Sequence, residues 1–373
     1  MLPTATWSTL RLNAIYQAVL ARNRFRRLEW DLVTPRDMSA RVRARCATWQ
    51  ESSDGRGYAD EGQRVSYLCS YRGDCLIEPR YGYVIERPLR LIDLSMPFSE
   101  WSRDKTFRHL IGFPSVTSIL LALAGRRPVL RHECVLSLRF YWEDNYFHFL
   151  NDILPRVRMA NVGGVPNDVP VVVGRKLAGQ KFFQSAFPDG TIDGRQIIFQ
   201  GEAFVASKQV VFARPPTDDQ DSPAYVADLL GAPKQPRGDN RVFVTRSRAR
   251  GRYILNLDAL RPVFARFDVN VVEAETLTMA DQVKLFSSAA LIVGIHGAGL
   301  GNMIFRRNAA CTILEILPPG ETATWFPRLA RRLEFAYRSL PGYVEGAMID
   351  RHQPFMVRPE DLAEVLRSVI APA

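Results

Sequence analysis

AALIVGIHGAGLGNMIF, residues 289–305, is the most informative stretch of the chain. An apolar run ends in glycines, an apolar-periodic segment follows them, and a second apolar run, TILEIL, occupies residues 312–317. This pattern predicts a buried strand, a tight turn, a short helix and a second buried strand. We expect the same alternation upstream, with strands at 241–245 and 269–272 and helices at 257–266 and 279–287. Such alternation predicts a doubly wound parallel sheet.

The sequence before this region is more mixed. Short apolar runs predict strands at 65–69, 83–85, 135–142, 169–174 and 195–199, and a buried helix at 115–124. Pro, Gly and Asp are concentrated between 214 and 240, which is typical of an inter-domain connection. The predicted organisation is a domain over 1–215, a linker over 216–240, a second domain over 241–350 and a C-terminal helical segment over 351–373.

Composition restricts the class of protein. The chain has 373 residues, of which 47% are hydrophobic and 24% charged, which excludes a disordered or fibrous protein. The net charge of +10 favours polyanions, phosphorylated small molecules or an anionic membrane as partners. Five scattered cysteines predict neither a disulfide scaffold nor a zinc site, and they fit a reducing cytoplasm. We expect neither a cleavable signal peptide nor a membrane-spanning segment. Residues 7–27 predict a basic amphipathic helix, suited to a membrane surface or to packing on its own domain.

NYFHFLNDILPR, residues 145–156, predicts a helix that aligns Asn145, His148 and Asp152, with Pro155 ending or bending it. An imidazole and a carboxylate one turn apart form a plausible general base, because the carboxylate supports the imidazolium that arises when a hydroxyl proton is accepted. Two alternatives remain at this stage. The pair can be a satisfied core histidine, or it can chelate a metal with help from the adjacent acids at 143 and 144.

TRSRARGR, residues 245–252, follows directly on a predicted strand and repeats arginine at every second position. Arginine next to the carboxyl end of a parallel strand lies where doubly wound folds bind anions. A solvated basic loop is the structural alternative. A nucleic-acid interface is a weaker one, because no stacking aromatic residues accompany the run.

The glycine-rich turn at 297–301 allows backbone N–H groups to approach a phosphate at the start of a helix. The spacing is GxGxG rather than the GxGxxG of dinucleotide-binding oxidoreductases. His296, at the end of the strand, can contact a phosphate or a sugar hydroxyl. Glu315 is a lone carboxylate in an apolar strand and therefore needs a partner, either a ribose diol or an arginine of the chain.

Taken together, these three motifs and the acid that follows them resemble glycosyltransferase family 61, a group that includes bacterial capsular polysaccharide enzymes. The resemblance covers roughly residues 140–320. It implies a GT-B-like architecture, with two Rossmann-like domains whose parallel sheets face each other across a cleft. It also implies an inverting mechanism and a nucleotide-diphosphate sugar held mainly by the C-terminal domain without an obligatory metal.

The resemblance also assigns roles to individual residues. The first motif supplies the catalytic residues His148 and Asp152, either of which could be the base. The second motif, extended to residue 256, the third motif and the acid that follows it supply the donor-binding residues: Arg246, Arg252, Asn256, His296, Gly297, Gly299, Asn302 and Glu315. Phe149 stands where the family usually has tryptophan, and Gly301 where threonine or serine is common.

These observations predict an inverting glycosyltransferase, with the base in the acceptor-side domain 1–215 and the nucleotide sugar in 241–350. We expect no metal and no cofactor beyond the nucleotide-diphosphate sugar, with a UDP-sugar favoured. The expected partner is a glycan or lipid-linked glycan acceptor in surface or exopolysaccharide biosynthesis. The expected location is the cytoplasm, with peripheral inner-membrane contact and no nucleic-acid partner. The alternative is a non-catalytic nucleotide-binding scaffold or regulator of a polysaccharide assembly complex.

Overall fold

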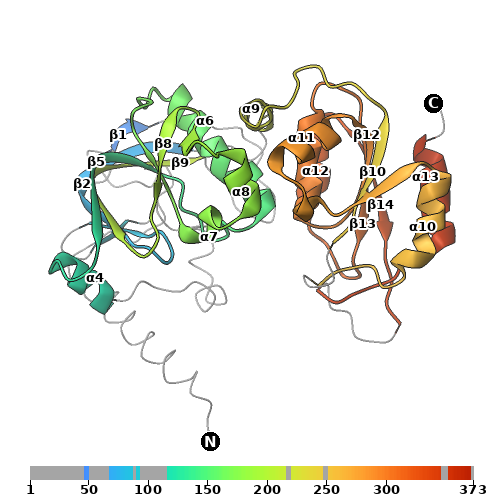
Figure 1. Ribbon diagram of the computed structural model, residues 1–373, viewed down its shortest axis with the longest axis horizontal. Coiled ribbons are helices and arrows are strands. Elements are labelled where there is room, and N and C mark those ends of the chain that lie inside the picture. Colours follow the sequence, from blue (N-terminus) through green and yellow to red (C-terminus); the bar gives the residue numbers. More distant parts are fainter. Residues whose placement is uncertain are drawn as a thin grey trace, which may run out of the picture. The chain divides into compact units, whose positions relative to one another are not determined.

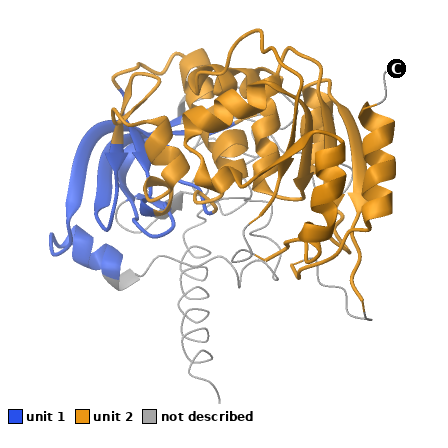
Figure 2. Cartoon of the chain, turned by 45° about the vertical axis from the view of Figure 1, so that its right-hand side comes forward, with its two compact units in different colours: residues 1–141, 169–175, 198–214 blue, residues 142–168, 176–197, 215–373 orange. Residues whose placement is uncertain are grey.

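The computed structural model describes residues 46–49, 67–86, 90–92, 116–215, 220–246, 251–345 and 352–370 (Figure 1). The predicted basic helix at 7–27 lies outside these residues, as do Arg248 and Arg250. The chain forms two compact units, coloured in Figure 2. Unit 1 comprises residues 1–141, 169–175 and 198–214, and unit 2 comprises residues 142–168, 176–197 and 215–373.

Unit 1 is built on a mixed sheet. Its strands are β1 (Cys46–Trp49), β2 (Tyr67–Ile77), β3 (Val84–Glu86), β4 (Arg90–Ile92), β5 (Val129–Ser137), β6 (Val171–Val173) and β9 (Phe204–Arg214). They lie in the order β4-β3-β2-β9-β5-β6, and β1 pairs with β2. The helix predicted at 115–124 is α4 (Val116–Leu123), and the predicted buried strand at 169–174 is β6, which pairs parallel with β5.

The prediction of a parallel sheet in the N-terminal part is wrong for most of these strands. β2 pairs antiparallel with both β3 and β9, whereas β5 pairs parallel with both β6 and β9. For the β2–β3 pair, the cause is the short connection between the two strands. It closes through a backbone bond from Glu78 N to Tyr83 O of 2.8 Å and a left-handed Gly82, and so short a connection can join only antiparallel strands.

Unit 2 contains the predicted parallel sheet. Five strands, β10 (Asn240–Val244), β11 (Val269–Val272), β12 (Ala289–Ile295), β13 (Thr312–Leu317) and β14 (Ala336–Pro341), lie in the order β11-β10-β12-β13-β14. Every neighbouring pair is parallel, which confirms the predicted α/β class for this part of the chain. The chain moves outward in one direction from β10 to β11 and in the other from β12 to β14. The boundary between β10 and β12 is therefore the topological switch point of the sheet.

Helices cover both faces of this sheet. The connecting elements are α10 (Leu257–Arg266), η5 (Ala274–Thr276), α11 (Met279–Ser287), the 3₁₀-helix η6 (Ala298–Arg306), α12 (Trp325–Arg332) and α13 (Pro359–Ile370). Helices α10 and α13 lie on one face, and α11 and α12 on the other (Figure 1). Strand β14 and helix α12 were not predicted. In the described part of the chain, no helix combines the length and apolar character needed to cross a membrane.

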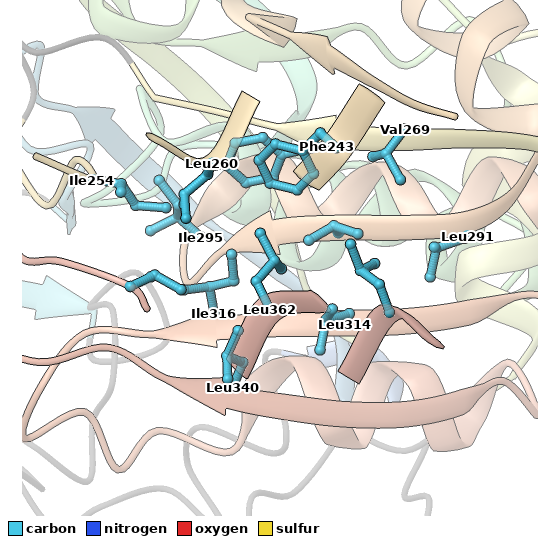
Figure 3. Close-up of a cluster of buried hydrophobic side chains, with 14 of the residues drawn as sticks. Phe243, Ile254, Leu260, Val269, Leu291, Ile295, Leu314, Ile316, Leu340 and Leu362 are labelled. Carbon is cyan, nitrogen blue, oxygen red and sulfur yellow. The ribbon is translucent and has the colours of Figure 1, made fainter. Parts of the chain in front are cut away.

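A continuous apolar core fixes the sheet against α10 and α13 (Figure 3). Phe243 of β10 stacks on Phe264 of α10 with ring centroids 4.5 Å apart, and Leu362 and Leu366 of α13 are fully buried in the same cluster. Each such side chain stabilises the fold by about 1.5–3 kcal/mol through burial. The C-terminal helical segment predicted at 351–373 therefore packs on the parallel sheet.

The remaining elements of unit 2 precede this sheet in the sequence. They are α5 (Tyr146–His148), the π-helix η3 (Phe149–Ile153), α6 (Leu154–Val162), α8 (Lys181–Ala186), β7 (Thr191–Ile192) and α9 (Asp221–Leu229). Helix α7 (Arg175–Ala178) and strand β8 (Arg195–Phe199) cross the boundaries between the units.

These compact units differ from the linear boundaries that we predicted. Residues 142–168 and 176–197, assigned to an N-terminal domain, belong to the unit of the parallel sheet, because α5 packs on η6 and α8 packs on α11. The segment expected to be a linker contains α9. A GT-B arrangement of two facing domains stays a prediction.

Candidate functional site

The candidate site lies at the carboxyl edge of the parallel sheet, at its switch point. Strands β10 and β12 are neighbours, with Val244 opposite Gly294. Arg246 follows the first strand and His296 follows the second, and the Arg246 guanidinium donates a hydrogen bond from Nη1 to the His296 carbonyl oxygen at 3.3 Å. Ligands of open α/β sheets bind at this edge, so the fold brings these two predicted donor-binding residues to the expected place.

The glycine turn lies directly against the end of β10. A Cβ atom on Gly297 would lie 2.8 Å from Nη1 of Arg246, and one on Gly299 would lie 2.8 Å from Cγ1 of Val244. These glycines therefore have a packing role in addition to the predicted exposure of backbone N–H groups. The turn leads into η6, at whose start no side chain of the described residues forms a cap, and the first N–H groups of a helix favour an anion.

Gly299→Ala tests this close packing. The added methyl group would overlap the stiff, β-branched side chain of Val244, so we expect a loss of about 1–3 kcal/mol in the free energy of unfolding. Urea denaturation measures the loss. The double variant Gly299→Ala/Val244→Ala should lose less free energy of unfolding than the two single variants lose when their losses are added. Strict additivity of the two losses would contradict the contact.

His296 is held by a buried hydrogen-bonded network. Its Nδ1 lies 2.5 Å from Oε1 of Glu315, and the Tyr337 hydroxyl donates to Oε2 of Glu315 at 2.6 Å. Glu315 is fully buried, and burial together with the Glu315 carboxylate raises the pKa of Tyr337. The partner expected for Glu315 was a ribose diol or an arginine. The arginine alternative is wrong, because the two carboxylate oxygens are hydrogen-bonded to His296 and Tyr337, so Glu315 orients His296. A contact between Glu315 and a ribose stays a prediction.

Two predicted donor-binding residues lie on the segment that follows β10. Arg252 directs its guanidinium towards Glu321, with Nη1 and Oε2 3.6 Å apart. Asn256 exchanges two hydrogen bonds with the backbone of Val357, donating from Nδ2 at 2.7 Å and accepting at Oδ1 at 3.1 Å. Asn256 therefore joins the start of α10 to the segment that precedes α13. The structure assigns it a scaffold contact instead of a donor contact.

The base helix, which we define as residues 145–156, is continuous but contains a π-helical turn. Asn145 caps its start, with Oδ1 accepting from the backbone N–H groups of Phe147 and His148 at 2.9 and 3.3 Å. The backbone N–H of Leu154 donates to the Phe149 carbonyl, five residues earlier. Pro155 lies at the start of α6, after this wider turn, so of the two expected effects, ending or bending the helix, the first does not occur.

His148 and Asp152 form the predicted pair. Nδ1 of His148 lies 2.7 Å from Oδ2 of Asp152, and each side chain is about a quarter exposed. The His148 ring stacks on Trp142, with centroids 5.2 Å apart and planes within 14°. The carboxylate and the aromatic face fix the orientation of the imidazole, as a general base requires, while leaving it within reach of solvent.

Asn302 connects the base helix to the glycine turn. Its fully buried side chain donates from Nδ2 to the Gly299 carbonyl and to Gln282, both at 3.1 Å, and its Oδ1 accepts from the Tyr146 hydroxyl at 2.6 Å. Burial raises the pKa of Tyr146 and keeps it a donor. We expected Asn302 to contact the donor. The structure places it between η6, α11 and α5, where it holds the turn against the base helix.

Tyr146→Phe should remove this connection at little cost in volume. The Oδ1 atom of Asn302 would lose its donor in a buried environment, so we expect a loss of about 1–3 kcal/mol in the free energy of unfolding. The matched control is Tyr225→Phe in the same unit, whose hydroxyl donates to the exposed Asp193 at 2.7 Å, where water can replace it. Equal losses in urea denaturation of the two variants would contradict the buried role of the Tyr146–Asn302 bond.

A series of ring contacts connects His296 through Phe326 and Phe147 to His148. Phe326, in the first turn of α12, contacts the His296 ring edge-on with centroids 5.2 Å apart. It contacts Phe147, the neighbour of His148, at the same centroid separation. The pattern of the sequence did not identify Phe326, Tyr337, Tyr146 or Glu321, because each contributes through contacts between elements distant in the chain.

The alternative of a metal site at His148 and Asp152 would need further ligands. Throughout the ranges that the structure describes, no three His, Cys, Asp or Glu side chains converge on a point that could hold a metal ion. Arg306 and Arg307 also have structural partners. The Arg306 guanidinium donates to the carbonyl groups of Ala310, Ser287 and Gly238, and Arg307 pairs with Asp228 of α9.

The fold and the residues at its carboxyl edge define an α/β domain suited to binding an anionic ligand beside a candidate general base. Comparison with known proteins specifies this class further. Residues 146–314, from the base helix into β13, match the model of the family Glycosyltransferase 61.

Two individual proteins are similar over different extents. A stretch of 109 residues is 33% identical to the EGF domain-specific O-linked N-acetylglucosamine transferase of Drosophila melanogaster, and it covers 28% of this chain and 21% of that relative. The solved structure of the bacterial iron-containing dodecameric glycosyltransferase TibC, from enterotoxigenic E. coli, aligns with 87% of this chain and 97% of its own, at 9% identity and a TM-score of 0.29.

Proposed function

We propose that this protein is an inverting glycosyltransferase that moves a sugar from a nucleotide-diphosphate sugar to an acceptor hydroxyl. One observation carries the proposal. A histidine–carboxylate pair, His148–Asp152, and an anion-binding edge with Arg246 and the glycine turn belong to the same compact unit, within the matched glycosyltransferase domain. Inverting transfer needs both parts, a base for the acceptor and a site that stabilises the leaving diphosphate.

In the proposed reaction, Nε2 of His148 accepts the proton of the acceptor hydroxyl, while Asp152 holds Nδ1. The acceptor oxygen forms a bond to the anomeric carbon, and the bond from that carbon to the phosphate oxygen breaks with its electron pair. The diphosphate then leaves with the additional negative charge. Arg246 and the first N–H groups of η6 stabilise this charge, and His296, oriented by Glu315, adds a donor at the same edge.

The substrates belong to the proposal as well. We infer a UDP-sugar as donor and a glycan or lipid-linked glycan as acceptor, in cytoplasmic surface or exopolysaccharide biosynthesis with a GT-B arrangement. The Drosophila relative is named for N-acetylglucosamine transfer, so UDP-N-acetylglucosamine is the first donor to test. The site relies on arginine and backbone N–H groups for charge stabilisation, so no metal is required.

Thermal unfolding with an excess of UDP, GDP, CDP or CMP, each with and without EDTA, tests the donor site. A nucleotide at about 100 times its dissociation constant adds about 2.7 kcal/mol to the free energy of unfolding, a shift of a few degrees. We expect one nucleoside diphosphate to raise the transition, with or without EDTA. No shift with any nucleotide would contradict a donor site. A shift without sugar turnover would support the nucleotide-binding scaffold instead.

A further inference from the structure

The carboxylate of Glu321 lies at the carboxyl edge of the sheet, between the side chains of His296 and Arg252. Glu321 belongs to the loop between β13 and α12, and its side chain is only 2% exposed. Its Oε2 atom lies 3.5 Å from Nε2 of His296 and 3.6 Å from Nη1 of Arg252. These two residues come from different segments, one after β12 and one after β10, so the carboxylate joins three parts of the edge.

The two oxygens of Glu321 are held in different ways. Oε1 accepts hydrogen bonds from the backbone N–H groups of Thr322 and Ala323 at 3.1 and 2.9 Å, which are ordinary hydrogen-bond lengths. The distances from Oε2 to Nε2 of His296 and to Nη1 of Arg252, 3.5 and 3.6 Å, are longer than the usual range of about 2.7–3.2 Å. The loop backbone therefore fixes Oε1, while Oε2 is directed towards His296 and Arg252.

An anionic oxygen between an imidazole and a guanidinium resembles a phosphate oxygen in charge and in hydrogen-bonding capacity. We infer that Glu321 occupies the position of a donor phosphate in the unliganded protein, and that a diphosphate displaces its carboxylate from Arg252 and His296. This inference rests on the proposed function for the nature of the ligand. Glu321 would therefore weaken diphosphate binding, whereas a residue that contacts the ribose or the sugar would strengthen ligand binding.

The size of the effect follows from competition between two anions for one place. The apparent dissociation constant of the diphosphate is its intrinsic value divided by the fraction of protein in which the carboxylate is displaced. Removing the charge of Glu321 makes the site available in every molecule. If the carboxylate occupies the site in two-thirds of the molecules or more, binding should tighten by about threefold or more.

The test uses Glu321→Gln in the purified chain, with titration calorimetry of inorganic pyrophosphate and of UDP. Glutamine keeps an oxygen for Thr322 and Ala323 but has no charge. The control is Glu334→Gln, which removes the same charge from an exposed position of unit 2 that follows α12. We expect Glu321→Gln to bind both probes about threefold or more tightly than wild type and Glu334→Gln to bind them as wild type does.

Unchanged or weaker binding by Glu321→Gln would overturn the inference, as would equal tightening by the control. Weaker binding of UDP with unchanged binding of pyrophosphate would identify Glu321 as a ligand of the nucleoside, which also overturns it. A second variant, Glu321→Ala, removes the charge together with the hydrogen bonds to Thr322 and Ala323. It replaces Glu321→Gln as the test if glutamine destabilises the loop, and it should also tighten pyrophosphate binding. The pyrophosphate result does not depend on sugar transfer, so the inference can fail while the proposed transferase activity stands.

Discussion

His148→Ala is expected to lower the rate of sugar transfer by about 10²–10⁴-fold, the usual contribution of a positioned general base. Binding of the nucleoside diphosphate should change by less than about twofold, because His148 lies on the base helix, whereas the diphosphate contacts that we propose come from Arg246 and the glycine turn. Initial rates of transfer and calorimetric titration with UDP measure the two quantities separately.

The controls for His148 separate catalysis from folding. Asp152→Asn should lower the transfer rate as well, because the amide can no longer support the imidazolium that forms in the reaction. His132→Ala, on β5 of unit 1, removes an imidazole outside the site and should leave the transfer rate unchanged. If His148→Ala lost donor affinity as strongly as activity, His148 would be a donor ligand and the assignment of the base would be wrong.

Arg246→Ala is expected to lower the transfer rate by about 10²–10³-fold, which corresponds to about 2.7–4 kcal/mol of transition-state stabilisation. The guanidinium lies at the end of β10, bonded to the His296 carbonyl and next to Gly297. Its loss removes a charge-assisted donor at the position where negative charge develops on the leaving diphosphate. Affinity for UDP should fall as well, since the diphosphate is already charged before the reaction.

The same strand provides a matched control. Arg241 lies near the amino end of β10, where its Nη1 donates to the Phe267 carbonyl at 2.8 Å. Arg241→Ala changes the net charge by the same amount at the opposite edge of the sheet, so we expect UDP affinity close to that of wild type. Equal losses in the two variants would mean that overall charge, and not the position of Arg246, attracts the nucleotide. An Arg246→Ala variant with unchanged affinity would remove Arg246 from the site.

The C-terminal fold could be predicted because central parallel strands are buried on both faces. Strand β12 appears in the sequence as an uninterrupted apolar run and β13 as an apolar run that contains Glu315, and glycines mark the turn between β12 and η6. Strand β14 was missed because it is an edge strand with only Leu340 buried, so its sequence, AYRSLP, contains no apolar run. The antiparallel pairs of unit 1 were missed because alternating short runs do not specify the direction of pairing.

The candidate site was predicted best where its contacts are local. His148 and Asp152 are four residues apart on one helix, so their spacing alone indicates the bond. Glu315 is 19 residues from His296 and 22 from Tyr337, and no local pattern reveals these partners. A buried polar residue always needs a partner, but the sequence does not indicate whether that partner is a ligand or another part of the chain. This explains why a ribose was one of the partners expected for Glu315, whereas Asn256 and Asn302 were assigned to the donor by the family resemblance.

The configuration of the transferred sugar tests the central claim most directly. The purified chain would be incubated with EDTA, UDP-N-acetylglucosamine or other UDP-sugars, and glycan acceptors, and the anomeric configuration of the new linkage would be read by proton NMR. Direct attack by an acceptor hydroxyl that His148 deprotonates predicts a product with the configuration opposite to that of the donor, and no product from His148→Ala. A product with retained configuration, or no sugar transferred from any donor, would contradict the account.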